Sequence, residues 1–320
     1  MLSYFARRAG VSLVQLAGLA LIAFSLIHLV PGNPVREMLG THATPHNVAV
    51  VSHRLGLDRS LLAQFGSFVA GVVTGHLGQS ITFGQPIAAL IGERFLPSFV
   101  LITYGLVVAV VVGVPLAVWS AVRPGGPVDH GVRIFATVSF AMPTFWLGLV
   151  LALVFGLKLH WLPVAGYTPG FVGVVRSLTL PAIVLGLSLL VIVVRTLRST
   201  MRKTLSTEFV EAERARGLST ARIVLHHVMR NAVMPTVTVL AVNVGFLIGG
   251  TVVLEQVFQI PGLGSLLFLA VEHRDYPVIE TLALMAGSGR GAQSPRGSRP
   301  GDHGPACPAG SSRCLAPLPQ

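Results

Sequence analysis

The sequence has few charged residues and almost no cysteine. Only 11% of its 320 residues are Asp, Glu, Lys or Arg, whereas ordinary soluble domains have roughly 25%. Hydrophobic residues make up 52%, and the mean hydropathy is +0.73. This composition excludes an ordinary soluble domain and indicates a membrane protein. The two cysteines, Cys307 and Cys314, both lie near the C-terminus, so no disulfide joins the body of the chain.

Several kinds of functional site are also missing from the sequence. The only lysines are Lys158 and Lys203, and no glycine-rich loop is followed by Lys-Ser or Lys-Thr, so this chain lacks a loop for binding ATP phosphates. No spacing suggests a nucleophile with a base and an orienting acid, which disfavours an enzyme. His226 and His227 are adjacent and would point about 100° apart on a helix, so no metal site is expected. Despite the net charge of +11, no basic-aromatic module for nucleic acid is visible.

Long apolar runs predict five transmembrane helices in one bundle. A bilayer core of about 30 Å needs about 20 apolar helical residues. The runs that qualify cover residues 10–30, 98–122, 134–157, 178–194 and 235–254. The first run resembles a signal peptide but is too long and has no cleavage site, so we interpret it as an uncleaved helix. Small residues inside the spans permit close helix contact, and these are Gly105, Gly113, Gly148 and Gly186.

Arginine placement predicts the orientation in the membrane. Arg7 and Arg8 precede the first span, Arg123 and Arg133 lie between the second and third, and residues 195–230 are strongly basic. Positively charged loops stay in the cytoplasm, so the N-terminus is predicted to be cytoplasmic. The span interiors carry no Asp or Glu, which disfavours a carrier driven by proton coupling through intramembrane carboxylates.

The long loop of residues 31–97 is then predicted to lie outside and to form short helices. Thr44 with Pro45 can begin one helix that Gly56 can end. Residues 61–73 form a second apolar segment. Pro86 opens a third, whose Ile87, Leu90 and Ile91 are predicted to lie on the membrane surface.

The C-terminal region changes abruptly in composition. A sixth span begins at Val278, but from Gly287 the chain is rich in Gly, Ser, Arg and Pro and cannot span a membrane. We therefore expect a bundle of residues 98–286 followed by a disordered tail of residues 287–320. A frameshift in a GC-rich gene would produce such a switch, and a natural disordered tail is the alternative.

The cytoplasmic segment of residues 207–222 predicts two short helices at an angle. Thr207 can cap the first, and Glu208 and Glu211 suit the positive end of its dipole. Gly217 can take the left-handed closing conformation, and Ser219 can cap the second helix. Such an exposed elbow suits a groove on another protein. An ordinary solvated loop is the alternative.

An apolar face is predicted on this elbow from Val210, Ala215 and Leu218. Glu211, Ala212 and Gly217 match the Glu-Ala-Ala, three residues, Gly signature, with Glu213 in place of the second Ala. The segment therefore resembles the coupling loop of ABC-importer permeases, within the cytoplasmic region of residues 195–234. The resemblance assigns contact with an ATPase to Glu211, Ala212, Ala215, Gly217 and Leu218.

Four further motifs resemble the dipeptide and oligopeptide permease family, in the family's order, so that the likeness covers residues 1 to about 286. They are Leu-Val-Pro-Gly-Asn-Pro at 29–34, Gly-His-Leu-Gly-Gln-Ser at 75–80, Pro-Gly-Leu-Gly at 261–264 and Arg-Asp-Tyr-Pro at 274–277. His76 stands where the family usually has Asp.

The resemblance implies an all-α polytopic bundle of the type I importer kind in a bacterial inner membrane, with five spans here and the family's usual sixth lost. It implies a second permease subunit, two ATPases that bind ATP and Mg, and an extracytoplasmic solute-binding protein. The expected cargo is a dipeptide or oligopeptide. Nickel or glutathione, or a secondary carrier working without an ATPase, are the alternatives.

Two polar residues near the fifth span are candidates for the solute pathway. Asn243 lies inside the span, and Glu255 begins the connection after it. Helix packing is the alternative for Asn243, and a solvated charge at the membrane interface is the alternative for Glu255.

Overall fold

The computed structural model describes residues 43–54, 57–80 and 82–291, and also residues 10, 11, 14, 15, 17–22, 24, 25, 35, 36 and 40. Of the predicted first span, the described residues are helical, and residues 26–30 lie outside the described part. The Leu-Val-Pro-Gly-Asn-Pro motif lies outside it as well. The described chain is built from helices, with one isolated antiparallel bridge between Gln79 and Pro86.

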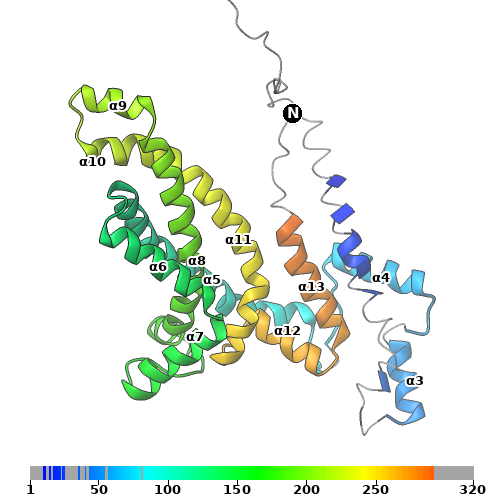
Figure 1. The fold of residues 1–320 in the computed structure, drawn as a ribbon. Helices are drawn as coiled ribbons and strands as arrows, with labels where there is room; N and C mark the ends of the chain where they lie inside the picture. The colour runs from blue at the N-terminus through cyan, green and yellow to red at the C-terminus, as the bar shows by residue number, and fades with distance from the viewer. Residues whose placement is uncertain are drawn as a thin grey trace, which may run out of the picture.

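The helices form an elongated bundle with the elbow at one end (Figure 1). Their bounds are α3 Pro45–Arg54, α4 Leu61–Thr74, α5 Ile87–Val122, α6 Pro127–Ala141, α7 Thr144–Leu151, the π-helical η2 Ala152–Lys158, α8 Phe171–Leu205, α9 Glu208–Ala215, α10 Thr220–Arg222, the π-helical η3 Ile223–Val228, α11 Met229–Val257, α12 Leu263–Glu272 and α13 Tyr276–Gly291. We call the end that carries α9 and α10 the inner end, and the end that carries α12 the outer end (Figure 1).

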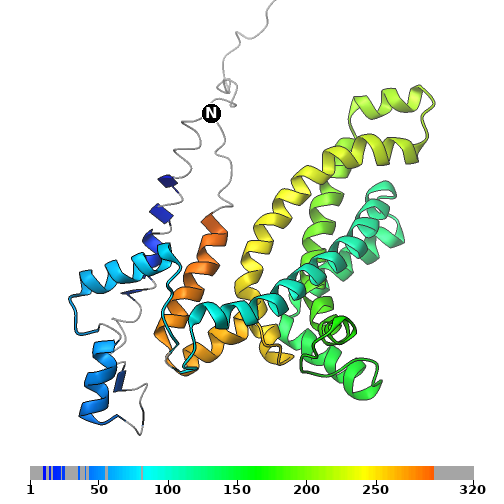
Figure 2. The same ribbon diagram turned by 180° about the vertical axis from the view of Figure 1, so that it is seen from behind.

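Two of the predicted spans are long single helices. By length and composition, α5 and α8 can each cross a membrane. α8 is the central helix. In its most apolar 18-residue stretch, 72% of the residues are buried, compared with 22% in the corresponding stretch of α5. α5 runs obliquely along the bundle beside α8 (Figure 2).

The third predicted span is not one straight helix. α6 and the α7–η2 segment meet at an angle of 103°. Met142 has an extended backbone, with ψ 129°, directly before Pro143, because a proline ring disfavours the helical conformation of the preceding residue. The span predicted over residues 134–157 is therefore broken at Pro143, and the bent pair can still make one crossing.

The fifth predicted span is also bent. Residues 220–245 and 250–257 meet at 63°. If each bent pair is one crossing, the described part of the chain has four candidate spans. α13 has 16 residues, or about 24 Å of helix, which is shorter than the roughly 30 Å bilayer core.

Glycines allow α5 and α8 to approach closely, as predicted. A Cβ atom on Gly186 would lie 2.8 Å from Val108 Cγ1 and 3.0 Å from the Gly105 carbonyl oxygen. A Cβ atom on Gly113 would lie 3.1 Å from Val193 Cγ1. These distances are tighter than ordinary contacts, so larger residues would separate the two helices.

The loop of residues 31–97 contains the first two helices expected from the sequence. α3 begins at Pro45, and Thr44 Oγ1 accepts a hydrogen bond from the Asn47 N–H at 3.2 Å. Gly56 lies outside the described residues. α4 ends at Thr74, and the next residue, Gly75, has a left-handed φ of +76°.

The segment after Pro86 does not lie where the sequence predicted. Ile87, Leu90 and Ile91 form the first turns of α5 and are buried against Leu266, Ala270, Val278 and Leu282 of α12 and α13. They pack in the core instead of lying on the membrane surface, because helices far away in the sequence cover them.

α13 continues past Gly287 to Gly291. The predicted tail therefore begins as helix, and residues 292–320, with both cysteines, lie outside the described part. Its disorder and its possible origin in a frameshift remain predictions.

Candidate coupling elbow and buried carboxylates

The coupling elbow, residues 207–222, projects from the inner end of the bundle (Figure 1). α9 and α10 are the two predicted short helices. Gly217 closes α9 with a left-handed φ of +82°, and Ser219 Oγ accepts a hydrogen bond from the Arg222 N–H at 3.4 Å. Both features confirm the sequence prediction. The Thr207 hydroxyl instead donates to the Thr204 carbonyl at 2.7 Å and does not cap α9.

The elbow exposes most of the residues that the resemblance assigned to ATPase contact. Glu211, Ala212, Ala215 and Gly217 are exposed, and Leu218 is half-buried. The predicted apolar face is wrong in one residue, because Val210 is buried in a cluster with α5, α8 and η3. Phe209 is a large apolar side chain on α9 that is 52% exposed.

Glu213 faces η3, the π-helical segment that follows the elbow. Its side chain is buried, and its carboxylate lies 3.6 Å from His227 Nε2 and 3.8 Å from Arg216 Nη1. The His227 ring also meets the Phe209 ring edge to face at 5.6 Å. His227 lies on η3, so this π-helical segment presents a side chain to α9. Glu213, which replaces the second Ala of the signature, thus joins the elbow to η3.

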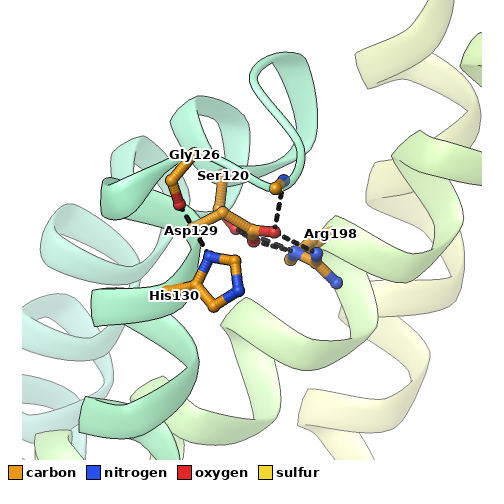
Figure 3. A network of polar contacts seen from close by, with 6 residues as sticks. Ser120, Gly126, Asp129, His130 and Arg198 are labelled. Carbon is orange, nitrogen blue, oxygen red and sulfur yellow. Dashed lines mark hydrogen bonds and ion pairs between the residues drawn. The ribbon is translucent and has the colours of Figure 1, made fainter.

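A network that we call the inner clasp ties the α5–α6 turn to α8 (Figure 3). Asp129 in the first turn of α6 is 1% exposed. Arg198 of α8 donates to both of its oxygens, Nε to Oδ1 and Nη2 to Oδ2, each at 2.8 Å. The Ser120 hydroxyl donates to Oδ1, and the Gly125 N–H donates to Oδ2 at 3.0 Å. A two-pronged charged contact of this kind fixes orientation as well as distance.

The local sequence explains how Asp129 reaches this position. Gly125 has a φ of +76° and reverses the chain after α5. Pro127 begins α6, where its fixed φ suits the first helical turn and its missing N–H costs nothing. Beside the clasp, the neighbouring His130 ring Nδ1 lies 3.0 Å from the Gly126 carbonyl oxygen (Figure 3).

Glu255 forms a second network, the outer clasp, with Ser98 of α5 and Ser265 of α12. The Ser98 hydroxyl donates to Oε1 at 2.7 Å, and the Ser265 N–H donates to Oε2 at 2.8 Å. Ser98 Oγ also accepts from the Leu263 N–H at 2.8 Å. Glu255 is fully buried, so its interpretation as a solvated interface charge is wrong. Its role in a solute pathway stays a prediction.

The outer clasp explains the Pro-Gly-Leu-Gly motif. A Cβ atom on Gly262 would collide with the Glu255 carboxyl group and with Ser98 Oγ. A Cβ atom on Gly264 would lie 2.6 Å from Val252 Cα and 3.0 Å from Glu255 Oε2. Both glycines are therefore needed for the chain to wrap closely around this carboxylate.

Two other motifs meet at the outer end. Asp275 of the Arg-Asp-Tyr-Pro motif is fully buried, and it accepts hydrogen bonds from the Ser80 hydroxyl and from the Thr82 N–H, the latter at 3.1 Å. Ser80 closes the Gly-His-Leu-Gly-Gln-Ser motif. Asp275 Oδ1 has no hydrogen-bond partner among the described residues. Two motifs almost two hundred residues apart in the sequence are thus joined by these hydrogen bonds.

Asn243 lies on α11 and is half-buried. Its Nδ2 donates to the Val239 carbonyl of its own helix at 2.8 Å. The hydrogen bond holds the amide against its own helix, and the predicted pathway role has no further support from these contacts.

Comparisons with known proteins show the family of the chain. Residues 113–288 match the family described as binding-protein-dependent transport system inner membrane component, and residues 1–102 match the N-terminal family of such membrane components. The chain belongs to this family. It is therefore a helical inner-membrane permease component of ABC transport systems, and such a component is not itself a catalytic enzyme.

Similar proteins cover nearly the whole chain. The di/tripeptide transport system permease protein DppB of Pseudomonas aeruginosa is 36% identical over 309 residues, which are 89% of this chain and 92% of that protein. A probable peptide ABC transporter permease of Sinorhizobium fredii is 34% identical, over 88% and 91% of the two chains. The glutathione transport system permease protein GsiC of Salmonella typhimurium is also 34% identical, over 89% and 92%.

The residues that hold the bundle ends were not predicted from the sequence. Arg198 was only one of many arginines in a basic segment, and Asp129, Ser98 and Ser120 were not singled out. One signal was available, because Asp129 is a lone acidic residue between Arg123 and Arg133 in a loop expected to be positive. Asp275 and Ser80 were noticed only as parts of separate motifs.

Proposed function

We propose that this permease forms half of the translocation path of an ATP-driven importer for dipeptides or oligopeptides. The other half is a second, similar permease subunit. The observation that carries the proposal is the coupling elbow, which exposes Glu211, Ala212 and Gly217 at the inner end of a chain that belongs to the family. Relatives named for di/tripeptide and peptide transport support the choice of cargo.

In this proposal, ATP and Mg are bound by two partner ATPases and the elbow enters a groove on one of them. The elbow end and the N-terminus face the cytoplasm, where ATP is available. A solute-binding protein delivers the peptide to the outer end. ATP-driven closure of the ATPases moves the elbow, and the bundle changes between outward-open and inward-open arrangements.

Glutathione is the second candidate cargo, because a relative of the same similarity is named as a glutathione permease. Nickel, proposed from the family resemblance, is a third. A secondary carrier remains the alternative from another class, and it would need no ATPase. Co-purification of the chain with the ATPase encoded beside it separates that alternative from an importer.

The elbow is tested by replacing Gly217 with Val in the assembled importer. A side chain at a φ of +82° is strained, by roughly 1–2 kcal/mol for an ordinary residue. We expect labelled dipeptide uptake to fall at least tenfold while the permease stays in the membrane.

Gly75→Val is the matched control for this experiment. Gly75 has a φ of +76°, and a Cβ atom there would meet nothing within 4 Å, as is also true of Gly217. It lies in the outer loop, so the same backbone strain should leave uptake near the unmodified level. Normal uptake by Gly217→Val would count against the elbow as the ATPase contact.

A further inference from the structure

The inner clasp lies where the elbow joins the bundle. α8 ends at Leu205 and α9 begins at Glu208, so the elbow follows directly from the helix that carries Arg198. Val210 of the elbow packs in one cluster with Ala117 and Ala121 of α5. The same cluster includes residues of α8, η3 and α11, namely Leu197, Met201, Ile223, Val224, Val228 and Ala232. Movement of the elbow therefore acts directly on α5, α8 and α11.

α6 has no residue in that cluster. Its apolar contacts lie farther along α8, where Val128 and Val132 pack near Leu190 and Val193. Apolar packing is non-directional, so such contacts do not by themselves fix the tilt of α6. At the inner end, the ion pair of Asp129 with Arg198 adds a directional link between α6 and α8 to this packing.

The turn between α5 and α6 contains two adjacent glycines, Gly125 and Gly126. Small residues at the ends of helices are common hinge positions. Asp129 holds this turn through the Gly125 N–H, and Ser120 of α5 contacts both Asp129 and Arg198. The clasp thus joins the end of α5, the start of α6 and α8 across a turn that could otherwise bend.

α6 leads toward the outer end of α11. After the bend at Pro143, Gly148 of α7 lies against Phe258, since a Cβ atom there would be 3.2 Å from Phe258 Cε2. The Gly166 N–H also donates to the Phe258 carbonyl at 2.8 Å. A continuous chain segment therefore runs from the inner clasp to the outer end of α11, next to Glu255.

We propose that Asp129 and Arg198 are positioning residues for coupling: their ion pair makes α6 move with α8 and the elbow, so that ATP-driven movement reaches α7 and the outer end of α11. The proposal rests on the proposed function. Without the ion pair, the two-glycine turn bends and the elbow moves without carrying α6. ATP is then still hydrolysed, but fewer peptides are transported for each ATP.

The test compares a double variant, Asp129→Leu with Arg198→Met, with the unmodified chain in the complete importer reconstituted in vesicles. Replacing a buried ion pair by apolar residues of similar size often keeps or raises stability, so this variant should assemble. We expect ATP hydrolysis stimulated by the binding protein to stay within about twofold, and labelled dipeptide uptake per ATP to fall at least tenfold. Assembly with unchanged uptake per ATP would show that the pair is only structural and would overturn the proposal.

Two further variants control this result. Arg198→Lys keeps the positive charge but loses the two-pronged contact, so uptake per ATP should take an intermediate value. Asp58→Asn removes a carboxylate paired with His53 on the exposed outer loop, and should leave uptake per ATP unchanged. If the unmodified importer shows no ATP-dependent uptake, the proposed function fails before the clasp is tested by transport.

A measurement that does not depend on transport distinguishes failure of the clasp proposal from failure of the proposed function. Spin labels are placed at Ile134 of α6 and Arg202 of α8, both exposed, after Cys307 and Cys314 are replaced by Ser. In the complete complex the unmodified clasp should give one narrow distance distribution, with and without ATP. The double variant should give a broad distribution, and an equally narrow one would overturn the proposal whatever the solute.

Discussion

The two ends of the permease hold buried carboxylates in different ways. At the inner end, Asp129 is bound by the guanidinium of Arg198. At the outer end, Glu255 and Asp275 accept from serine hydroxyls and backbone N–H groups, and neither forms an ion pair with an Arg or Lys in the described part of the chain. The inner network is therefore ionic, and the outer networks depend on neutral dipoles.

This difference matters for what each end can do. A charged, two-pronged contact is directional and strong, which suits a joint that must transmit movement from an ATPase. Neutral donors hold a carboxylate through several weaker bonds, which can be exchanged one at a time. We therefore expect the inner end to act as a rigid joint and the outer end to tolerate rearrangement.

Arg198→Met should cause the largest loss of stability. It leaves Asp129 buried without its cation, and removing one partner of a buried pair costs about 3–5 kcal/mol. The measurement is unfolding of the purified chain in detergent. The double variant with Asp129→Leu should recover most of the loss, and equal losses in the single and double variants would contradict the ionic account.

Ser98→Ala should have a smaller effect at the outer end. It removes the hydroxyl that donates to Glu255 and accepts from the Leu263 N–H. An unsatisfied buried group costs about 1–3 kcal/mol, so the loss should be below that of Arg198→Met in the same unfolding experiment. Ser98→Thr, which keeps the hydroxyl, is the control. A loss as large as that of Arg198→Met would remove the contrast between the ends.

Asp275→Asn should lower the free energy of unfolding less than Ser98→Ala does, by under about 1 kcal/mol. The amide oxygen can accept from Ser80 and Thr82, and the amide nitrogen takes the place of Oδ1, which has no partner among the described residues. Asp129→Asn is the matched substitution, and it should cost more because the new N–H groups face Arg198. Equal losses in the two variants would show that the charge on Asp129 is not what distinguishes the ends.

Asn243→Ala should have the smallest effect on stability, within about 0.5 kcal/mol. The amide is bonded only to its own helix, at Val239, among the contacts of the described residues. Uptake kinetics of the same variant test the predicted pathway role. A raised KM for dipeptide with unchanged unfolding would support it, and unchanged uptake would remove Asn243 from the pathway.

Local features of this permease followed well from the sequence. Gly217 was predicted to be left-handed because only glycine adopts that conformation easily, and α3 and α4 followed from capping and apolar patterns. The bend at Met142 and Pro143 was also a local signal, but an apolar run across it suggested one helix.

The networks at the two ends were not predictable from local pattern. Ser98 meets Glu255 across 157 residues, Ser80 meets Asp275 across 195, and Asp129 meets Arg198 across 69. Such contacts depend on how the helices pack, and a single sequence carries no direct signal of helix packing. The membrane-surface position predicted for Ile87 is wrong for the same reason, since α12 and α13 cover this residue.

The central claim is that this permease carries peptides when a partner hydrolyses ATP. The most direct measurement is labelled dipeptide uptake in cells that lack their own peptide importers and express this chain with the permease, ATPase and binding-protein genes beside it. We expect uptake that stops when the ATPase is made unable to hydrolyse ATP. Uptake that continues with the inactive ATPase would contradict the claim and favour a secondary carrier.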